Sequence, residues 1–192
     1  MLDNAYIARN LRGGLLVMLG RREALELLDI SADGFWRSFQ AIIIALPPLA
    51  LSWFAYGHAL AGGALSVGDV VFRAALVDAA SWFVPLIALA YAAIYLGFSD
   101  RYAHYVVASN WASALLPYLL LPSIIAEWLA PQAKDVISFL SLAMFVASLV
   151  FVYRMTHVAL NRPLPLTIAV FTAMLLFSLL VIVVAQKALG LG

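Results

Sequence analysis

A carboxylate stands inside an apolar stretch that is long enough to cross a bilayer. Residues 73–97, RAALVDAASWFVPLIALAYAAIYLG, exceed the ~20 apolar residues that span ~30 Å of hydrocarbon, yet they include Asp78, with Pro85 near their middle. Ionisable groups within a span are costly and normally face protein or water rather than lipid. Asp78 is therefore expected to face the interior of a helical bundle and to be at least partly protonated at neutral pH.

The neighbours of Asp78 leave two interpretations open. Ser81, Trp82 and Pro85 follow it at i+3, i+4 and i+7 on one helix face, whereas Arg73 lies off that face and is no automatic partner. Asp78 is either a proton or cation site, or a structural carboxylate that fixes the packing of helices.

Depth within the spans predicts two separate polar layers. At a rise of 1.5 Å per residue, Asp78 lies roughly 12 Å below the outer membrane surface, near the levels of Ser52 and Tyr118, which could donate hydrogen bonds to it. Asn110 lies nearer the inner face, where an amide either bonds between helices or binds a ligand. The predicted polar interior comprises Asp78, Ser81, Tyr118, Ser52 and Asn110.

No residue pattern predicts a catalytic or metal site. The three histidines are scattered over different segments, and the chain has no cysteine. A phosphate loop, a Gly-x-Ser-x-Gly elbow and a His-Glu-x-x-His motif are all missing from the sequence. We therefore expect no catalytic residues, no metal ligands and no cofactor, and we do not expect an enzyme.

Composition assigns the chain to the membrane. Of its 192 residues, 66% are hydrophobic and 11% are charged, and the mean hydropathy is +1.02. Soluble domains carry roughly 25% charged residues and under 50% apolar ones, so the bilayer must serve as the solvent. The net charge of +1 is too small to indicate a nucleic-acid-binding protein, which would carry a strongly basic surface.

The apolar runs predict an all-α membrane domain over residues 35–192. Its five transmembrane helices are expected at about 36–57, 70–97, 104–129, 136–159 and 164–188. Prolines interrupt the first three spans, and broken helices are tolerated at membrane depth where they line protein or a cavity. We interpret these three spans as the working part and the last two as packing.

Residues 1–34 are expected to form a cytoplasmic, interfacial segment. Within it, residues 4–28 are predicted to be an amphipathic helix, and Gly13 and Gly14 are the expected point for any break in it. The helix either lies in the membrane interface or packs beneath the bundle as a solvated cap. Its apolar stripe is Ile7, Leu11, Leu15 and Met18.

Basic residues orient the five spans. With the N-terminus inside, eight arginines fall on inner segments, whereas Arg73, Lys134 and Lys187 fall on outer ones. Because inner loops of membrane proteins carry an excess of lysine and arginine, we expect a cytoplasmic N-terminus and an external C-terminus in a cell inner (plasma) membrane.

The layout resembles the Yip family, named for Ypt/Rab-interacting proteins. The resemblance covers about residues 35–190 and rests on the span count, on FSDRYAH leading into ASNWASALLPYLLLPS, and on VYRMTHVALNRPLP between the last two spans. The chain has DISADGFW where eukaryotic members carry an Asp-Leu-Tyr-Gly-Pro approach, which puts a Rab-type partner in doubt. The short N-terminal segment is similar to that of bacterial members.

The resemblance implies a non-enzymatic integral membrane protein that acts through contacts with other membrane components. Its expected partners are membrane lipids, other membrane proteins or a second copy of the chain, and not nucleic acid. The alternative function is a small transporter or an ion- or proton-coupled permease subunit with Asp78 in its polar interior, which the proline-broken spans favour.

Overall fold

The structure, a computed structural model, describes residues 3–60 and 65–191. Every regular element in these residues is helical, which confirms the all-α class. The elements are α1 Asn4–Met18, the 3-10 helix η1 Arg22–Leu27, α2 Ala32–Ser38, α3 Ala41–Ala59, α4 Val67–Tyr95, α5 Ser99–Ser113, α6 Leu116–Leu129, α7 Lys134–Leu160 and α8 Leu164–Ala188.

Five helical segments are long and apolar enough to cross a membrane, as the apolar runs predicted. They cover Ala32–Ala59, Val67–Tyr95, Ser99–Leu129, Lys134–Leu160 and Leu164–Ala188. The third segment is divided into α5 and α6 just before Pro117, because proline has no amide hydrogen to donate to the carbonyl four residues earlier, at Ser113. In contrast, α3 continues through Pro47 and Pro48, and α4 continues through Pro85.

Side chains define where several helices begin and end. Ser31 caps α2 by accepting a hydrogen bond from the Gly34 amide at 3.0 Å. Ser66 and Asp69 form a reciprocal capping box at the start of α4. At the end of α7, Asn161 adopts the left-handed conformation with φ 47°.

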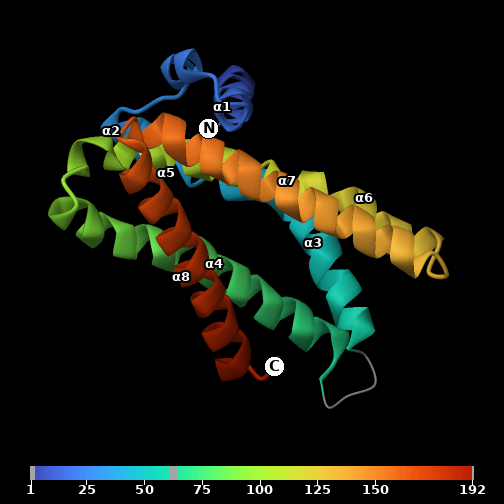
Figure 1. Ribbon diagram of the computed structural model, residues 1–192. Helices are drawn as coiled ribbons and strands as arrows, with labels where there is room; N and C mark the ends of the chain where they lie inside the picture. The colour runs from blue at the N-terminus through green and yellow to red at the C-terminus, as the bar shows by residue number, and fades with distance from the viewer. Residues whose placement is uncertain (1–2, 61–64, 192) are drawn as a thin grey trace.

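The helices converge at the end that carries α1 and diverge toward the other end (Figure 1). One diverging pair is α4 with α8, and the other is α6 with α7; the helices of each pair are in contact. Helix α5 contacts α7, α4 and α3 near the convergent end. The two chain ends lie at opposite ends of this arrangement (Figure 1).

The N-terminal segment folds as a docked helix rather than as one helix over residues 4–28. Helix α1 continues through Gly13 and Gly14 and ends at Met18; the break falls at Gly20, whose φ of 87° favours glycine. It packs against α5 and α7. This arrangement matches the cap alternative more closely than a helix lying free in the interface.

The face that α1 buries agrees with the predicted apolar stripe only in part: Met18 is buried and Ile7 and Leu11 pack against the core, but Leu15 does not. Its buried residues are Tyr6, Asn10, Gly13, Gly14, Val17 and Met18, whereas the side chain of Leu15 is 47% exposed. The two glycines explain the difference, since they allow a close approach: a Cβ on Gly14 would lie 3.0 Å from the carbonyl carbon and the Cβ of Trp111. The side-chain oxygen of Asn10 accepts a hydrogen bond from the Asp29 backbone amide at 3.1 Å, which ties α1 to the segment before α2.

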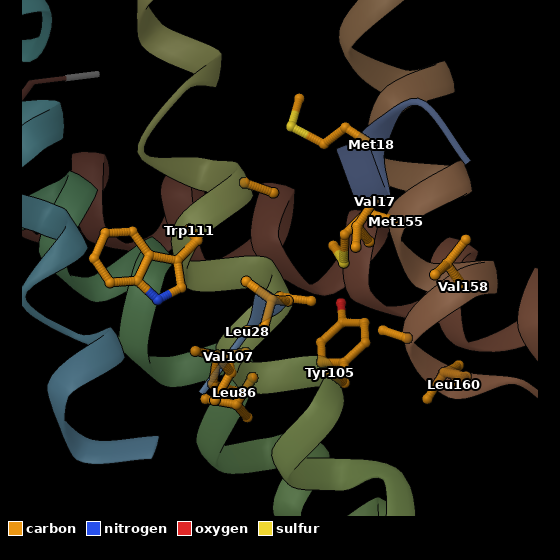
Figure 2. Close-up of a cluster of buried hydrophobic side chains, with 14 of the residues drawn as sticks. Val17, Met18, Leu28, Leu86, Tyr105, Val107, Trp111, Met155, Val158 and Leu160 are labelled. Carbon is orange, nitrogen blue, oxygen red and sulfur yellow. The ribbon is translucent and has the colours of Figure 1, made fainter. Parts of the chain in front are cut away.

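The hydrophobic core lies at the convergent end. Figure 2 shows side chains from α1, α4, α5 and α7 gathered around Tyr105, Val107 and Trp111. By contrast, α6 buries only Ser123, and α8 buries only Thr167 and Val170 among the described residues. Tight packing at one end and open packing at the other leave space between the diverging helix pairs.

Candidate functional site

A cavity of 410 Å³ occupies the space between the two helix pairs. All five long helical segments line it, including α7 and α8, which contradicts the expectation that the last two spans serve only for packing. Most of its wall is apolar. The polar side chains that line it are Ser52, Asp78, Ser81, Ser109, Ser113, Thr156 and Ser178.

Asp78 lines this cavity from α4 and is half-buried, so the expectation that it faces the bundle interior agrees with its position. Its Oδ2 atom accepts a hydrogen bond from the indole nitrogen of Trp53 on α3 at 2.7 Å. The described residues place no lysine, arginine or histidine within 4.0 Å of its carboxylate. Asp78 is therefore a carboxylate with one neutral donor and one oxygen left for another partner.

The prediction that Ser52 and Tyr118 donate hydrogen bonds to Asp78 was wrong. Ser52 also lines the cavity, but its hydroxyl donates to the Pro48 carbonyl at 3.1 Å. The Tyr118 hydroxyl lies elsewhere and donates to the Ile44 carbonyl at 2.7 Å. In a regular helix, that carbonyl would accept the amide of residue 48, but Pro48 has no amide hydrogen. Pro48 therefore leaves the Ile44 carbonyl free to accept the hydrogen bond from Tyr118.

Trp53 is the residue that sequence reasoning missed. Its position next to Ser52 gives it nearly the same depth as Asp78, and a partly buried indole N–H usually has a hydrogen-bond acceptor. Those two facts together would have favoured Trp53 over Ser52, whose hydroxyl can bond within its own helix.

Replacing Tyr118 with phenylalanine is expected to lower the free energy of unfolding by about 1 kcal/mol, because the Ile44 carbonyl then loses the donor that takes the place of the missing amide. In a Pro48→Ala background, alanine restores the backbone amide at position 48, which can bond the Ile44 carbonyl, so the loss should shrink. A double-mutant cycle from thermal unfolding in detergent measures this coupling. Equal losses in both backgrounds would contradict the link between Tyr118 and Pro48.

Asn110 belongs to a second, separate hydrogen-bond chain at the convergent end. It is fully buried. Its Oδ1 atom accepts from the indole nitrogen of Trp82 at 2.9 Å, and its Nδ2 donates to the Ser38 hydroxyl at 2.8 Å. Because an indole N–H can only donate, the orientation of the amide is fixed. Ser38 in turn donates to the Phe35 carbonyl at 2.6 Å, so the chain joins α4, α5 and α2.

The five residues of the predicted polar interior thus divide into three groups. Asp78, Ser81 and Ser52 line the cavity. Asn110 does not line it but holds Trp82, which does. Tyr118 lies 40% exposed on α6, outside both clusters.

Charged groups gather at the two ends of the helices. At the convergent end, Asp100 pairs with Arg162, and Arg22 lies 3.2 Å from the His157 ring nitrogen. In the cap, hydrogen bonds from Ser31 hold the pKa of Asp29 below its ordinary value. At the other end, Arg73 donates to the Leu189 carbonyl at the end of α8. The described residues contain no group of three His, Cys, Asp or Glu side chains that could hold a metal ion.

No protein-family model, curated protein or solved structure matches this chain. The resemblance to the Yip family therefore rests only on the residues of the sequence, and function must be inferred from the geometry described above.

Proposed function

We propose that the chain is an integral membrane protein with five spans in a bacterial inner (plasma) membrane. The supporting observation is the exposure of long apolar side chains along α7 and α8, including Phe139 at 74% and Leu176 at 61%. Monomeric soluble proteins rarely expose apolar patches beyond a few hundred Å², and lipid would cover these faces.

We further propose a non-enzymatic, Yip-like role in which the protein acts through contacts with other membrane components. The apolar faces of α7 and α8 supply the contact surface, and the docked α1 supplies a rigid inner cap. Lipids, other membrane proteins and a second copy of the chain are the candidate partners.

The second candidate function is a small transporter or an ion- or proton-coupled permease subunit. One specific observation favours it: Asp78 faces a cavity that all five spans line. Carboxylates in such positions mark ion or substrate pathways in membrane proteins.

One experiment separates the two functions. A photoreactive amino acid at Phe139 or Leu176 should give discrete crosslinked species in intact cells under the contact function, whereas the buried Leu160 position serves as the control. Under the transporter function, purified protein in liposomes should carry a proton or cation flux that Asp78→Asn abolishes. Flux without crosslinks would replace the first function with the second.

Topology gives a further prediction. All eleven lysines and arginines lie in described residues, and the eight at the end that bears α1 outnumber the three at the other end, which are Arg73, Lys134 and Lys187. Reporter fusions at Asp100 and Arg162 should therefore report the cytoplasm, and a fusion at Ala133 should report the outside. An external signal at Asp100 or Arg162 would contradict the proposed orientation.

A further inference from the structure

Three features of the cavity indicate what it could bind. Its volume of 410 Å³ suits a small organic molecule. Its wall is largely apolar, with aromatic rings from Trp82, Tyr105 and Phe171. It contains a single carboxylate, Asp78, which has no cationic partner in the described chain.

Trp53 binds one oxygen of this carboxylate and leaves the other oxygen open. Its indole N–H donates to one oxygen of Asp78, and a hydrogen bond to an ionised acceptor is stronger than one to a neutral acceptor. The other oxygen, Oδ1, accepts no hydrogen bond from the described residues. Burial disfavours a negative charge that has no partner, so the charged form of Asp78 is most stable when a cation occupies the space beside its open oxygen.

The chemistry of the cavity favours an organic cation over a metal ion. Hard metal cations take about six to eight oxygen ligands, whereas this cavity offers one carboxylate. Three of its hydroxyls, on Ser52, Ser81 and Ser109, donate to carbonyls of their own helices. A protonated amine needs only one carboxylate, and its carbon body can use the apolar wall.

We propose that the cavity binds a lipophilic organic monocation, with its protonated amine against Asp78 and its apolar body against Trp82, Tyr105 and Phe171. The rings contribute through cation–π attraction as well as contact area. The inference deepens the second candidate function by naming its substrate class. It rests on that function for the route of entry between the diverging helix pairs, but binding can be measured without flux.

The test uses three probes of nearly equal shape and different charge: 2-phenylethylamine, which is protonated at neutral pH, the neutral 2-phenylethanol and the anionic 3-phenylpropionate. Their binding to the full chain in phosphatidylcholine nanodiscs is measured by calorimetry, with the heats of empty nanodiscs subtracted. The amine should bind at least about tenfold more tightly than the alcohol, because a hydrogen bond between two charged groups is stronger than one from a neutral hydroxyl. The anion should bind most weakly, and this comparison uses the wild-type protein and needs no variant.

Two variants then locate the site. Asp78→Asn keeps the shape and an acceptor for Trp53, and it should reduce amine affinity about tenfold while leaving the alcohol unchanged. Ser178→Leu should weaken both ligands by filling the cavity. The matched control is Asp135→Asn, which removes an exposed carboxylate at the start of α7 and should change neither affinity.

Equal affinity for amine and alcohol, or no binding of the amine, would overturn the proposal, as would an unchanged affinity in Asp78→Asn. Flux is scored separately. Amine binding without transport would support the binding site and reject the permease function. Proton flux without amine binding would support the permease function and reject the binding site.

Discussion

Asn110→Leu is expected to lower the free energy of unfolding by about 2–4 kcal/mol. The Asn110 side chain bonds two other side chains, one buried and one half-buried, and the substitution removes both hydrogen bonds at once. The indole nitrogen of Trp82 would lose its acceptor, and the Ser38 hydroxyl would lose its donor. Leucine is also larger than asparagine, so a packing clash adds to the cost.

The loss should extend beyond the immediate contacts. Asn110 is the one residue that joins α4 to α2 through side-chain bonds at the convergent end of the described chain. Without it, Trp82 is free to rotate, and Trp82 forms part of the cavity wall. We therefore expect Asn110→Leu to weaken any ligand that binds beside Asp78, although Asn110 itself does not line the cavity.

Thermal unfolding of the purified protein in detergent, monitored by circular dichroism, measures this effect. The control is Ser148→Ala on α7, whose exposed hydroxyl bonds to the Phe145 carbonyl of its own helix. Its melting temperature should stay within about a degree of wild type, since surface changes of this kind cost under ~0.5 kcal/mol. A wild-type melting temperature for Asn110→Leu would show that the hydrogen-bond chain contributes nothing to stability.

The number and approximate positions of the long helices were predictable from sequence because they depend on apolar run length. A run of about 20 apolar residues has few alternatives to a buried or membrane-spanning helix. Run length is a local property, which a sequence displays directly. Proline alone did not tell which helix is interrupted: α3 continues through Pro47 and Pro48 and α4 through Pro85, although prolines were expected to interrupt these spans too, and only the third segment is divided at a proline.

The partner of Asp78 was harder to predict because it depends on the rotation of one helix against another. Counting residues gives the depth of Ser52, Trp53 and Tyr118, but depth does not tell which of them faces α4. A competing acceptor also had to be recognised: Pro48 leaves the Ile44 carbonyl without its usual donor, and Tyr118 binds that carbonyl.

The buried face of α1 was predicted only in part, for a related reason. A search for apolar periodicity selects large side chains such as Leu15. The docking of α1 onto α5 depends instead on Gly13 and Gly14, which have no side chains and let the two helices approach closely. Two adjacent glycines within a helical pattern were interpreted as a break, although glycine within a helix can also mark close packing against a neighbour. The buried Asn10 beside them was the available signal, because a polar residue on a packed face needs a specific partner.

That docking leads to the second large effect. Gly14→Leu should displace α1 from the bundle, because even its Cβ would lie 3.0 Å from the backbone of Trp111, which cannot move aside as a flexible side chain can. Separation exposes Val17 and Met18, and each such side chain contributes ~1.5–3 kcal/mol when buried. We expect the docked state to lose about 3 kcal/mol.

Limited digestion with trypsin detects the displacement directly, since α1 and the segment after it carry Arg9, Arg12, Arg21 and Arg22. When opening and closing are fast, cleavage follows the population of the open state, so a loss of about 3 kcal/mol should accelerate it roughly a hundredfold. Gly14→Ala, which adds only the Cβ, should give an intermediate rate, and Leu15→Ala on the exposed face should leave the rate unchanged. If Gly14→Leu were cleaved as slowly as wild type, α1 would remain docked, and the close approach at Gly14 would not be what holds it against α5.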